Sequence, residues 1–142
     1  MKLHALPCYC ATLRQATRAV TGLYEKALAG TGLHIAQYTA LLLMKMGPNL
    51  TTTELAGAIG VDQTTAPRTL ALIRKLGLAS VRPGADRREK LWTLTAKGEG
   101  MLRKVAPAWE AAQAELERRL GRGEAAALKS AAFGAASKLA AG

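Results

Sequence analysis

The sequence predicts a mainly helical fold with one small β-hairpin, and three observations lead to this prediction. Apolar residues recur at helical spacing over most of the chain, two short helical segments joined by a glycine lie near its middle, and a strand-like segment with a charged turn follows them. The chain has 142 residues, of which 49% are hydrophobic, so it can bury one compact core. We therefore expect a single domain over residues 1–142.

The first part of the chain is expected to form two helices. Over residues 8–29, apolar and small side chains recur three and four positions apart, as on one stripe of a helix, and a pair of glycines follows the pattern. A second apolar segment covers residues 35–46 and is closed by Gly47-Pro48. Two helices with clear stop signals therefore precede the middle of the chain.

A capping box predicts where the next helix begins. Thr51 and Glu54 fit the pattern S/T-x-x-E, in which the two side chains satisfy backbone amides at a helix start. A short helix over about residues 52–59 should follow, and Gly60 should turn the chain so that Asp62 can cap a further helix. The apolar residues of that further helix are Ala66, Leu70, Ile73 and Leu76. Two short helices joined by such a turn form a helix-turn-helix.

The period of the pattern changes after Gly77. Residues 78–82 can form one strand, and residues 90–94, which read KLWTL, can form a second strand. Between them, residues 83–89 are rich in turn-forming and charged side chains. The expected product is a β-hairpin that projects a basic loop, which is called a wing.

Two terminal helices complete the predicted fold. Thr95 can cap a long helix over about residues 96–120, in which Pro107 should introduce a kink. Gly121 and Gly123 should separate it from an alanine-rich helix over about residues 124–140. The apolar stripes of the terminal helices are too long to be buried in so small a monomer, which indicates a homodimer.

The charge balance favours a polyanionic partner. Lysine and arginine number 20 against 10 aspartate and glutamate, so the formal net charge is +10. Nucleic acid and an anionic membrane surface both suit such a charge, although a basic surface can also serve solubility alone. The sequence contains no apolar run of about 20 residues and no apolar secretory signal at its N-terminus. We therefore expect a cytoplasmic protein that does not act at a membrane.

Two motifs carry a resemblance to a known family. Residues 86–98 read DRREKLWTLTAKG, which fits D-x-R-x-x-x-x-x-L-T-x-x-G, and residues 62–78 fit most of D-x-S-T-x-T-R-x-L-x-x-L-x-x-x-G-L. Here the chain resembles the MarR family of bacterial transcriptional regulators, over nearly its whole length. The resemblance implies a winged helix-turn-helix over about residues 50–95, with dimerisation helices over about 8–46 and 96–140.

The resemblance assigns the helix after Asp62 to the major groove of double-stranded DNA, where arginine pairs with guanine and a threonine methyl can touch thymine. Helix capping is the other reading of its threonines, and Pro67 departs from the family pattern, which commonly has threonine there. In the wing, Arg88 matches the family's minor-groove arginine, with Asp86 as its orienting partner. The other wing cations suit phosphates, or simply a solvated hairpin. The candidate DNA-binding residues are Gln63, Thr64, Thr65, Arg68, Arg82, Asp86, Arg87, Arg88 and Lys90.

The two cysteines form a second candidate site. Cys8 and Cys10 are too close in sequence to staple a fold, and they lie near the positive end of the first predicted helix, which makes a thiol more reactive. The resemblance implies that Cys10 occupies the sensing position of the family's organic-hydroperoxide branch, near Tyr24 of a partner subunit. A sensor of other electrophiles, a soft-metal site with His4, and inert buried thiols are the alternatives. We expect no bound metal and no cofactor.

These observations predict a sequence-specific transcriptional regulator. We expect a repressor of a pseudo-palindromic operator that is released by a small-molecule ligand or by thiol oxidation. A non-specific architectural DNA-binding protein is an alternative of another class. A thiol peroxidase would need an arginine or histidine constellation near the thiols, and none has a recognisable spacing. We therefore expect no enzymatic activity.

Overall fold

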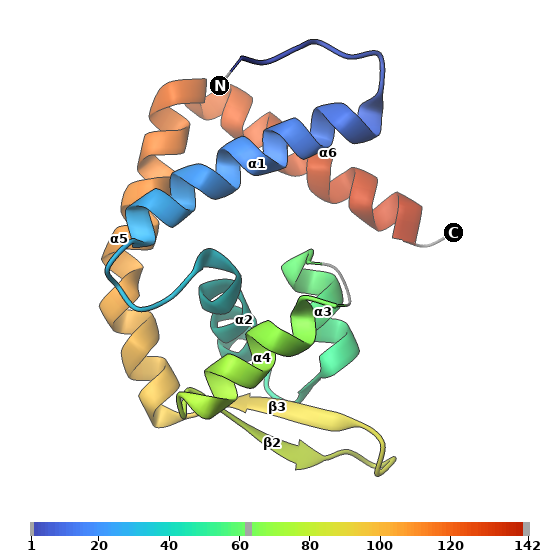
Figure 1. Ribbon diagram of the computed structural model, residues 1–142, viewed down its shortest axis with the longest axis vertical. Helices are drawn as coiled ribbons and strands as arrows, with labels where there is room; N and C mark the ends of the chain where they lie inside the picture. The colour runs from blue at the N-terminus through green and yellow to red at the C-terminus, as the bar shows by residue number, and fades with distance from the viewer. Residues whose placement is uncertain (1, 62–63, 141–142) are drawn as a thin grey trace. The chain divides into compact units, whose positions relative to one another are not determined.

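The computed structural model describes residues 2–61 and 64–140, and it confirms the mainly helical fold with a small antiparallel sheet (Figure 1). The elements in chain order are α1 (Tyr9–Leu28), α2 (Ile35–Met46), β1 (Leu50–Thr51), α3 (Thr52–Ile59), α4 (Ala66–Lys75), β2 (Ala79–Pro83), β3 (Lys90–Leu94), α5 (Ala96–Leu120) and α6 (Arg122–Ala140). The sequence predicted only β2 and β3. Strand β1 was missed because two residues are too few to show the alternation of a strand.

The chain groups into two compact units. The central unit comprises Leu28–Ala108 and contains the helix-turn-helix and the wing. The terminal unit comprises Met1–Ala27 and Trp109–Gly142, so it contains most of α1, the second half of α5 and all of α6. Helix α5 continues through Pro107 and belongs to both units. That the chain acts as one domain stays a prediction.

The central unit has a true hydrophobic core. Its largest fully buried side chains come from every helix of the unit and from the base of the wing: Leu28, Leu41, Leu55, Leu70, Ile73, Leu78 and Val105. Gln37 is buried among them, and its Oε1 accepts the backbone N–H of His34 at 2.9 Å, which fixes the start of α2. This core holds α4 and the sheet in fixed positions.

The predicted capping box begins α3. The Glu54 N–H donates to the Thr51 hydroxyl oxygen at 3.1 Å, and the Thr51 N–H donates to the Glu54 carboxylate at 2.8 Å. The helix ends at Gly60, whose φ of 75° is left-handed and favours glycine. The two residues that follow Val61 are outside the described part of the chain, and the predicted cap by Asp62 is among them.

The sheet has the strand order β1-β3-β2, with Leu50 opposite Trp92 and Val81 opposite Trp92 on its other side. Its connection to α5 explains the second half of the wing motif. The Thr95 hydroxyl donates to the Gly77 carbonyl at 2.7 Å and accepts the Gly98 N–H at 3.0 Å, so it caps α5 as predicted and ties it to the end of α4. The threonine and glycine of L-T-x-x-G are therefore structural.

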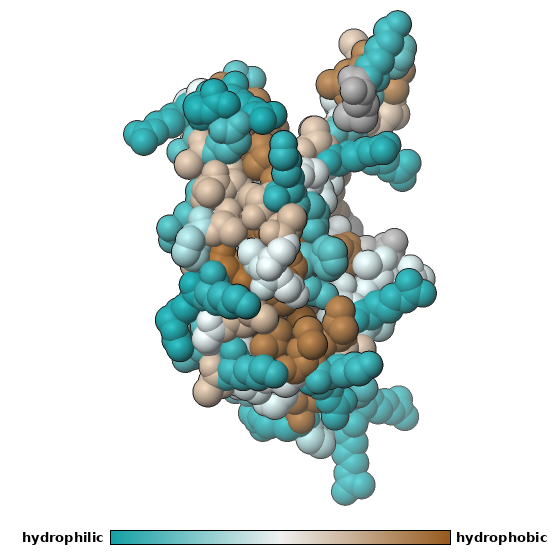
Figure 2. Space-filling view, turned by 60° about the vertical axis from the view of Figure 1, so that its left-hand side comes forward, coloured by the Kyte–Doolittle hydropathy of each residue, from teal (hydrophilic) through white to brown (hydrophobic). Residues whose placement is uncertain are grey.

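The terminal unit lacks such a core. Among its described residues, only Ala112 and Ala125 are buried. The large apolar side chains that it exposes are Leu3, Leu6, Tyr9, Leu13, Leu128, Phe133 and Leu139. Figure 2 shows one face of the whole molecule, central unit included, with apolar surface lying open between projecting hydrophilic side chains. The sequence placed two glycines before the last helix, but α6 already begins at Arg122, because Gly121 alone makes the turn with a φ of 83°.

No helix in the described part of the chain is both long enough and apolar enough to cross a membrane.

Candidate DNA-binding interface

Helix α4 turns one face toward the core and another toward solvent. Ala66, Leu70 and Ile73 are buried, and Arg68 is exposed on the other side of the helix. The guanidinium of Arg68 carries donors in a rigid fork that suits the edge of a base. The structure therefore presents Arg68 where a groove of DNA could receive it.

The start of α4 differs from the prediction. Thr64 and Thr65 are exposed, but they lie in the turn before the helix, because α4 begins only at Ala66. Thr65 acts as the N-cap residue, and its carbonyl accepts the Thr69 N–H at 3.1 Å. Pro67 is the second residue of α4, where a backbone N–H has no partner within the helix, so it removes no helical hydrogen bond. The candidate Gln63 lies outside the described residues.

The loop of the wing is held by a tight turn at its tip. The Glu89 N–H donates to the Asp86 carbonyl at 2.9 Å, and the Gly84 N–H donates to the Glu89 carbonyl at 3.0 Å. The Asp86 carboxylate accepts the backbone N–H of Arg88 at 3.0 Å. This hydrogen bond to the Arg88 backbone fixes the turn. That Asp86 orients the Arg88 side chain stays a prediction.

The cations of the wing are all exposed. Arg87 and Arg88 lie in the loop, Lys90 begins β3, and Arg82 lies on β2 (Figure 1). The Arg82 Nη2 donates to Oδ1 of Asn49 at 2.9 Å. Sequence analysis missed Asn49, since its partner is 33 residues away and no local pattern links the two.

A basic groove separates α4 from the wing. It has a volume of about 490 Å³, its floor includes Leu70 and Trp92, and its rim carries Arg74, Lys75 and Lys90. The Trp92 indole N–H donates to the Thr52 hydroxyl at 2.8 Å, which ties the floor of the groove to the start of α3. Sequence analysis named Lys90 but missed Arg74 and Lys75, whose place beside the wing depends on the packing of α4.

The comparisons with known proteins identify the family. No family model and no curated protein matches the chain. Among solved structures, the transcriptional regulator MosR of M. tuberculosis is 37% identical over 90% of this chain and 97% of MosR, with a TM-score of 0.73. A structure of MosR in complex with DNA is 38% identical over 90% and 98% of the two chains, with a TM-score of 0.70. The chain belongs to the MarR family.

More distant structures show the same fold. A MarR-family regulator from Rhodococcus is 19% identical over 92% of this chain and 96% of its own, with a TM-score of 0.77. The PcaV transcriptional regulator of Streptomyces coelicolor, solved with its natural ligand, is 19% identical over 96% and 98% of the chains, with a TM-score of 0.76. MarR-family proteins are DNA-binding transcriptional regulators rather than enzymes, in agreement with the function predicted from the sequence.

The candidate sensing residues of this MarR-family chain lie in the terminal unit. Cys8 and Cys10 are exposed, and the Cys8 sulfur accepts the Ala11 N–H at 3.5 Å just before α1 begins. Cys10 lines an open groove of about 900 Å³ on α1, together with Leu13 and Leu139. Both thiols can therefore meet a reagent in a single chain, which argues against the reading that they are buried and inert.

Tyr24 lies near the other end of α1 from Cys10, so one chain does not bring the two together. It lines an adjoining hollow of about 370 Å³ with Leu116 and Glu117 of α5. Burial, and then the charge of Glu117, raise the pKa of the Tyr24 phenol, which therefore stays protonated and able to donate a hydrogen bond at neutral pH. In the part of the chain that the structure describes, no three His, Cys, Asp or Glu side chains gather as a metal site, so the soft-metal reading gains no support.

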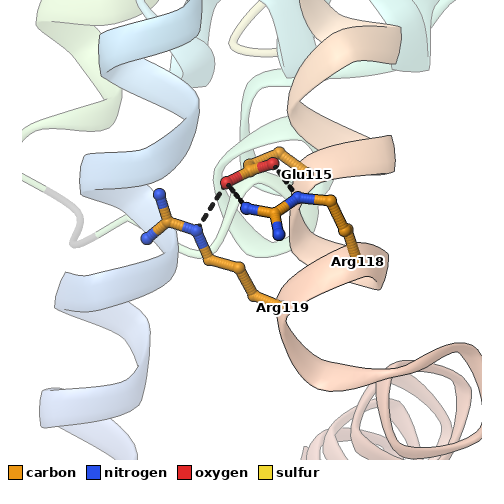
Figure 3. Close-up of polar contacts among 3 residues, drawn as sticks. All are labelled: Glu115, Arg118 and Arg119. Atoms are coloured by element: carbon orange, nitrogen blue, oxygen red, sulfur yellow. Dashed lines mark hydrogen bonds and ion pairs between the residues drawn. The ribbon is translucent and has the colours of Figure 1, made fainter.

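A charged network lies on α5 (Figure 3). The Glu115 carboxylate accepts hydrogen bonds from Arg118 at 2.8 Å and from Arg119 at 2.6 Å. These bonds lower the pKa of Glu115 to about 2, so the carboxylate stays ionised at neutral pH. Sequence analysis did not single out this network, which is a local pairing of residues one turn apart.

Proposed function

We propose that this chain is a homodimeric, sequence-specific repressor that binds a pseudo-palindromic operator in the cytoplasm. The observation that carries the proposal is the exposure of Arg68 on α4 together with the exposure of Arg87 and Arg88 in the wing loop of the same compact unit. A helix and a basic hairpin on one rigid core suit two neighbouring grooves of DNA.

Each candidate residue has a role in this proposal. Arg68 reads guanine in the major groove, and Thr64 and Thr65 contact the same groove from the turn before α4. Gln63, which lies outside the described residues, is assigned to this groove from the sequence alone. Arg88 enters the minor groove, and Asp86 fixes the turn that carries it. Arg82, Arg87 and Lys90 contact phosphates, which sets position and affinity without reading sequence.

The terminal unit supports the homodimer. Its described residues bury only two alanine side chains, yet it exposes Tyr9, Phe133 and Leu139. Helices with so little core of their own need another apolar surface, and a second copy of the same unit supplies one. Light scattering should therefore give a dimer at micromolar concentration, and a monomer there would contradict this part of the proposal.

Thiol oxidation is our first proposal for the release signal. Cys10 is exposed on α1, and a protonated Tyr24 can donate a hydrogen bond to a thiolate. An antiparallel pairing of two α1 helices around Thr17 would bring Cys10 of one subunit to Tyr24 of the other, since these residues lie on one helical stripe. Cys8 could then act as the resolving thiol for a sulfenic acid on Cys10.

Ligand binding is the alternative release signal. The terminal unit has a hollow of about 650 Å³ between α1 and α5, with apolar walls that include Val20 and Leu23 and with Lys26 and Arg119 at its rim. Glu115, which pairs with Arg119, lines the hollow too, so its size and apolar walls suit a small, largely apolar organic ligand. Such a ligand would change DNA binding only if it favoured one arrangement of the two DNA-binding units over another.

One experiment tests the proposed function directly. Sequences bound by the protein are selected from a random DNA duplex pool, and the selection is repeated with an organic hydroperoxide and with a thiol reagent. We expect a pseudo-palindrome to be enriched under reducing conditions and lost after oxidation. Binding without enrichment of any sequence would instead favour an architectural DNA-binding protein.

A further inference from the structure

Asn49 has an unusual backbone. Among the residues that the structure describes, it is the one non-glycine residue with a positive φ, at 64°. Asparagine tolerates this left-handed conformation better than most residues, although glycine adopts it more freely. A non-glycine residue at such a position points to a use for its side chain.

The side chain of Asn49 reaches across the sheet. Asn49 directly precedes β1. Its Oδ1 accepts hydrogen bonds from Arg82 Nη2 at 2.9 Å and from the Thr93 hydroxyl at 3.5 Å. Arg82 lies on β2 and Thr93 on β3, so one amide oxygen links all three strands of the sheet.

Asn49, which binds Arg82, has a neutral side chain, so the Arg82 guanidinium keeps its full positive charge. A guanidinium has five N–H donors, and the bond to Asn49 uses one nitrogen of the group while Arg82 stays exposed. A carboxylate at the same place would hold the side chain equally well, but it would cancel the positive charge and repel a phosphate. An amide holds the side chain and leaves its charge intact.

We propose that Asn49 is a positioning residue for DNA binding, which holds the Arg82 guanidinium in place on the wing without neutralising it. This inference rests on the proposed function, in which Arg82 contacts a DNA phosphate. It assigns a role in that contact to a residue outside both family motifs.

The expected effect follows from the order that Asn49 imposes on Arg82. Without Asn49, the long side chain must be ordered when DNA binds, and immobilising one such side chain costs about two- to tenfold in affinity. The loss should therefore depend on the presence of Arg82.

The test measures the affinity of the full chain for a labelled DNA duplex of mixed sequence, as a function of salt. Asn49→Gly keeps the left-handed backbone and removes the acceptor, whereas Asn49→Asp keeps the acceptor and adds a charge. We expect Asn49→Gly to weaken binding about two- to tenfold with a nearly unchanged salt slope. Asn49→Asp should weaken binding further and lower the salt slope by about one.

Arg82→Ala and the double variant Asn49→Gly/Arg82→Ala complete a double-mutant cycle with wild type and Asn49→Gly. In the Arg82→Ala background, Asn49→Gly should have no further effect on affinity. An equal loss in both backgrounds would mean that Asn49 serves only the fold, and it would overturn the inference. If Arg82→Ala weakens binding but Asn49→Gly does not, the inference about Asn49 is wrong, while the proposed contact of Arg82 with a phosphate stands. If Arg82→Ala has no effect on binding, both the phosphate contact and the inference about Asn49 are wrong. Urea unfolding of each variant checks that it is folded.

Discussion

Alanine in place of Gly98 should destabilise the protein, although alanine normally favours a helix. Gly98 lies in the first turn of α5, against the base of the wing. A Cβ atom there would lie 2.1 Å from the carbonyl oxygen of Leu78 and 2.6 Å from Cδ1 of Leu94. That carbonyl also accepts the Thr95 N–H at 3.2 Å, so it belongs to a fixed backbone and cannot rotate away. Either α5 or the wing must move.

The magnitude follows from two opposing contributions. At an open helical position, replacing glycine with alanine stabilises a protein by about 1 kcal/mol. Forcing a methyl group into a packed site costs about 1–3 kcal/mol, and the upper end applies here because the obstructing atom is backbone. Gly98→Ala should therefore lower the free energy of unfolding by about 2 kcal/mol.

Gly100 provides a matched control on the same helix. The nearest atom to a Cβ at Gly100 is a guanidinium nitrogen of Arg103 at 3.9 Å, which is an ordinary contact with a flexible side chain. Gly100→Ala should therefore stabilise the protein by up to about 1 kcal/mol.

Urea unfolding followed by circular dichroism, at one protein concentration, measures both variants of this pair. The two midpoints should lie on opposite sides of the wild-type midpoint, with free energies of unfolding about 3 kcal/mol apart. If Gly98→Ala were as stable as Gly100→Ala, the close packing of α5 against Leu78 would be refuted. The same result would leave the glycine of the wing motif without a structural reason.

Three further predictions concern binding, sensing and pH. Arg68→Ala should relax base preference by about 1–3 kcal/mol in a competition assay, whereas Arg87→Ala should weaken all sequences alike and lower the salt slope by about one; equal losses of specificity would contradict this division. Cys10→Ser should bind DNA normally in reducing buffer but resist release by an organic hydroperoxide, and wild-type protein that stays bound with Cys10 unmodified by mass analysis would exclude the sensor. Because the pKa of Glu115 is lowered from 4.5 to about 2, its stabilising contribution is present above pH 4.5 and is lost as the pH falls toward 2. The melting temperatures of wild type and Glu115→Gln should thus differ at neutral pH and converge near pH 2; a constant difference would argue against the network.

Local sequence patterns were enough to predict most of the fold. The helical spacing of apolar residues predicted α1 and α2, and the Thr51–Glu54 capping box predicted the residue at which α3 begins. Thr95 likewise caps α5 as its type and position predicted. These features are local, because each depends on residues within one or two turns of each other. Strand β1 was missed, since its only signal is its pairing with β3, which is far along the chain.

The candidate interface was predicted less completely. The charges of the wing are visible in the sequence, but the contact of Asp86 with the backbone of Arg88 depends on the conformation of the turn. Pro67 is visible too, but the sequence analysis expected the helix to follow Asp62, whereas α4 begins at Ala66 with the threonines in the turn before it. The pairing of Asn49 with Arg82 depends on the tertiary fold, and no periodicity could reveal it.

If the chain dimerises as proposed, the small core of the terminal unit would make the lifetime of the protein depend on its abundance. With only Ala112 and Ala125 buried among its described residues, this unit should then gain most of its stability from association. A newly made chain would then remain open to proteolysis until it met a second copy. At low expression most copies would be degraded as monomers, and above a threshold the paired form would accumulate and persist. Repression would then rise more steeply than the rate of synthesis, before any effector acts.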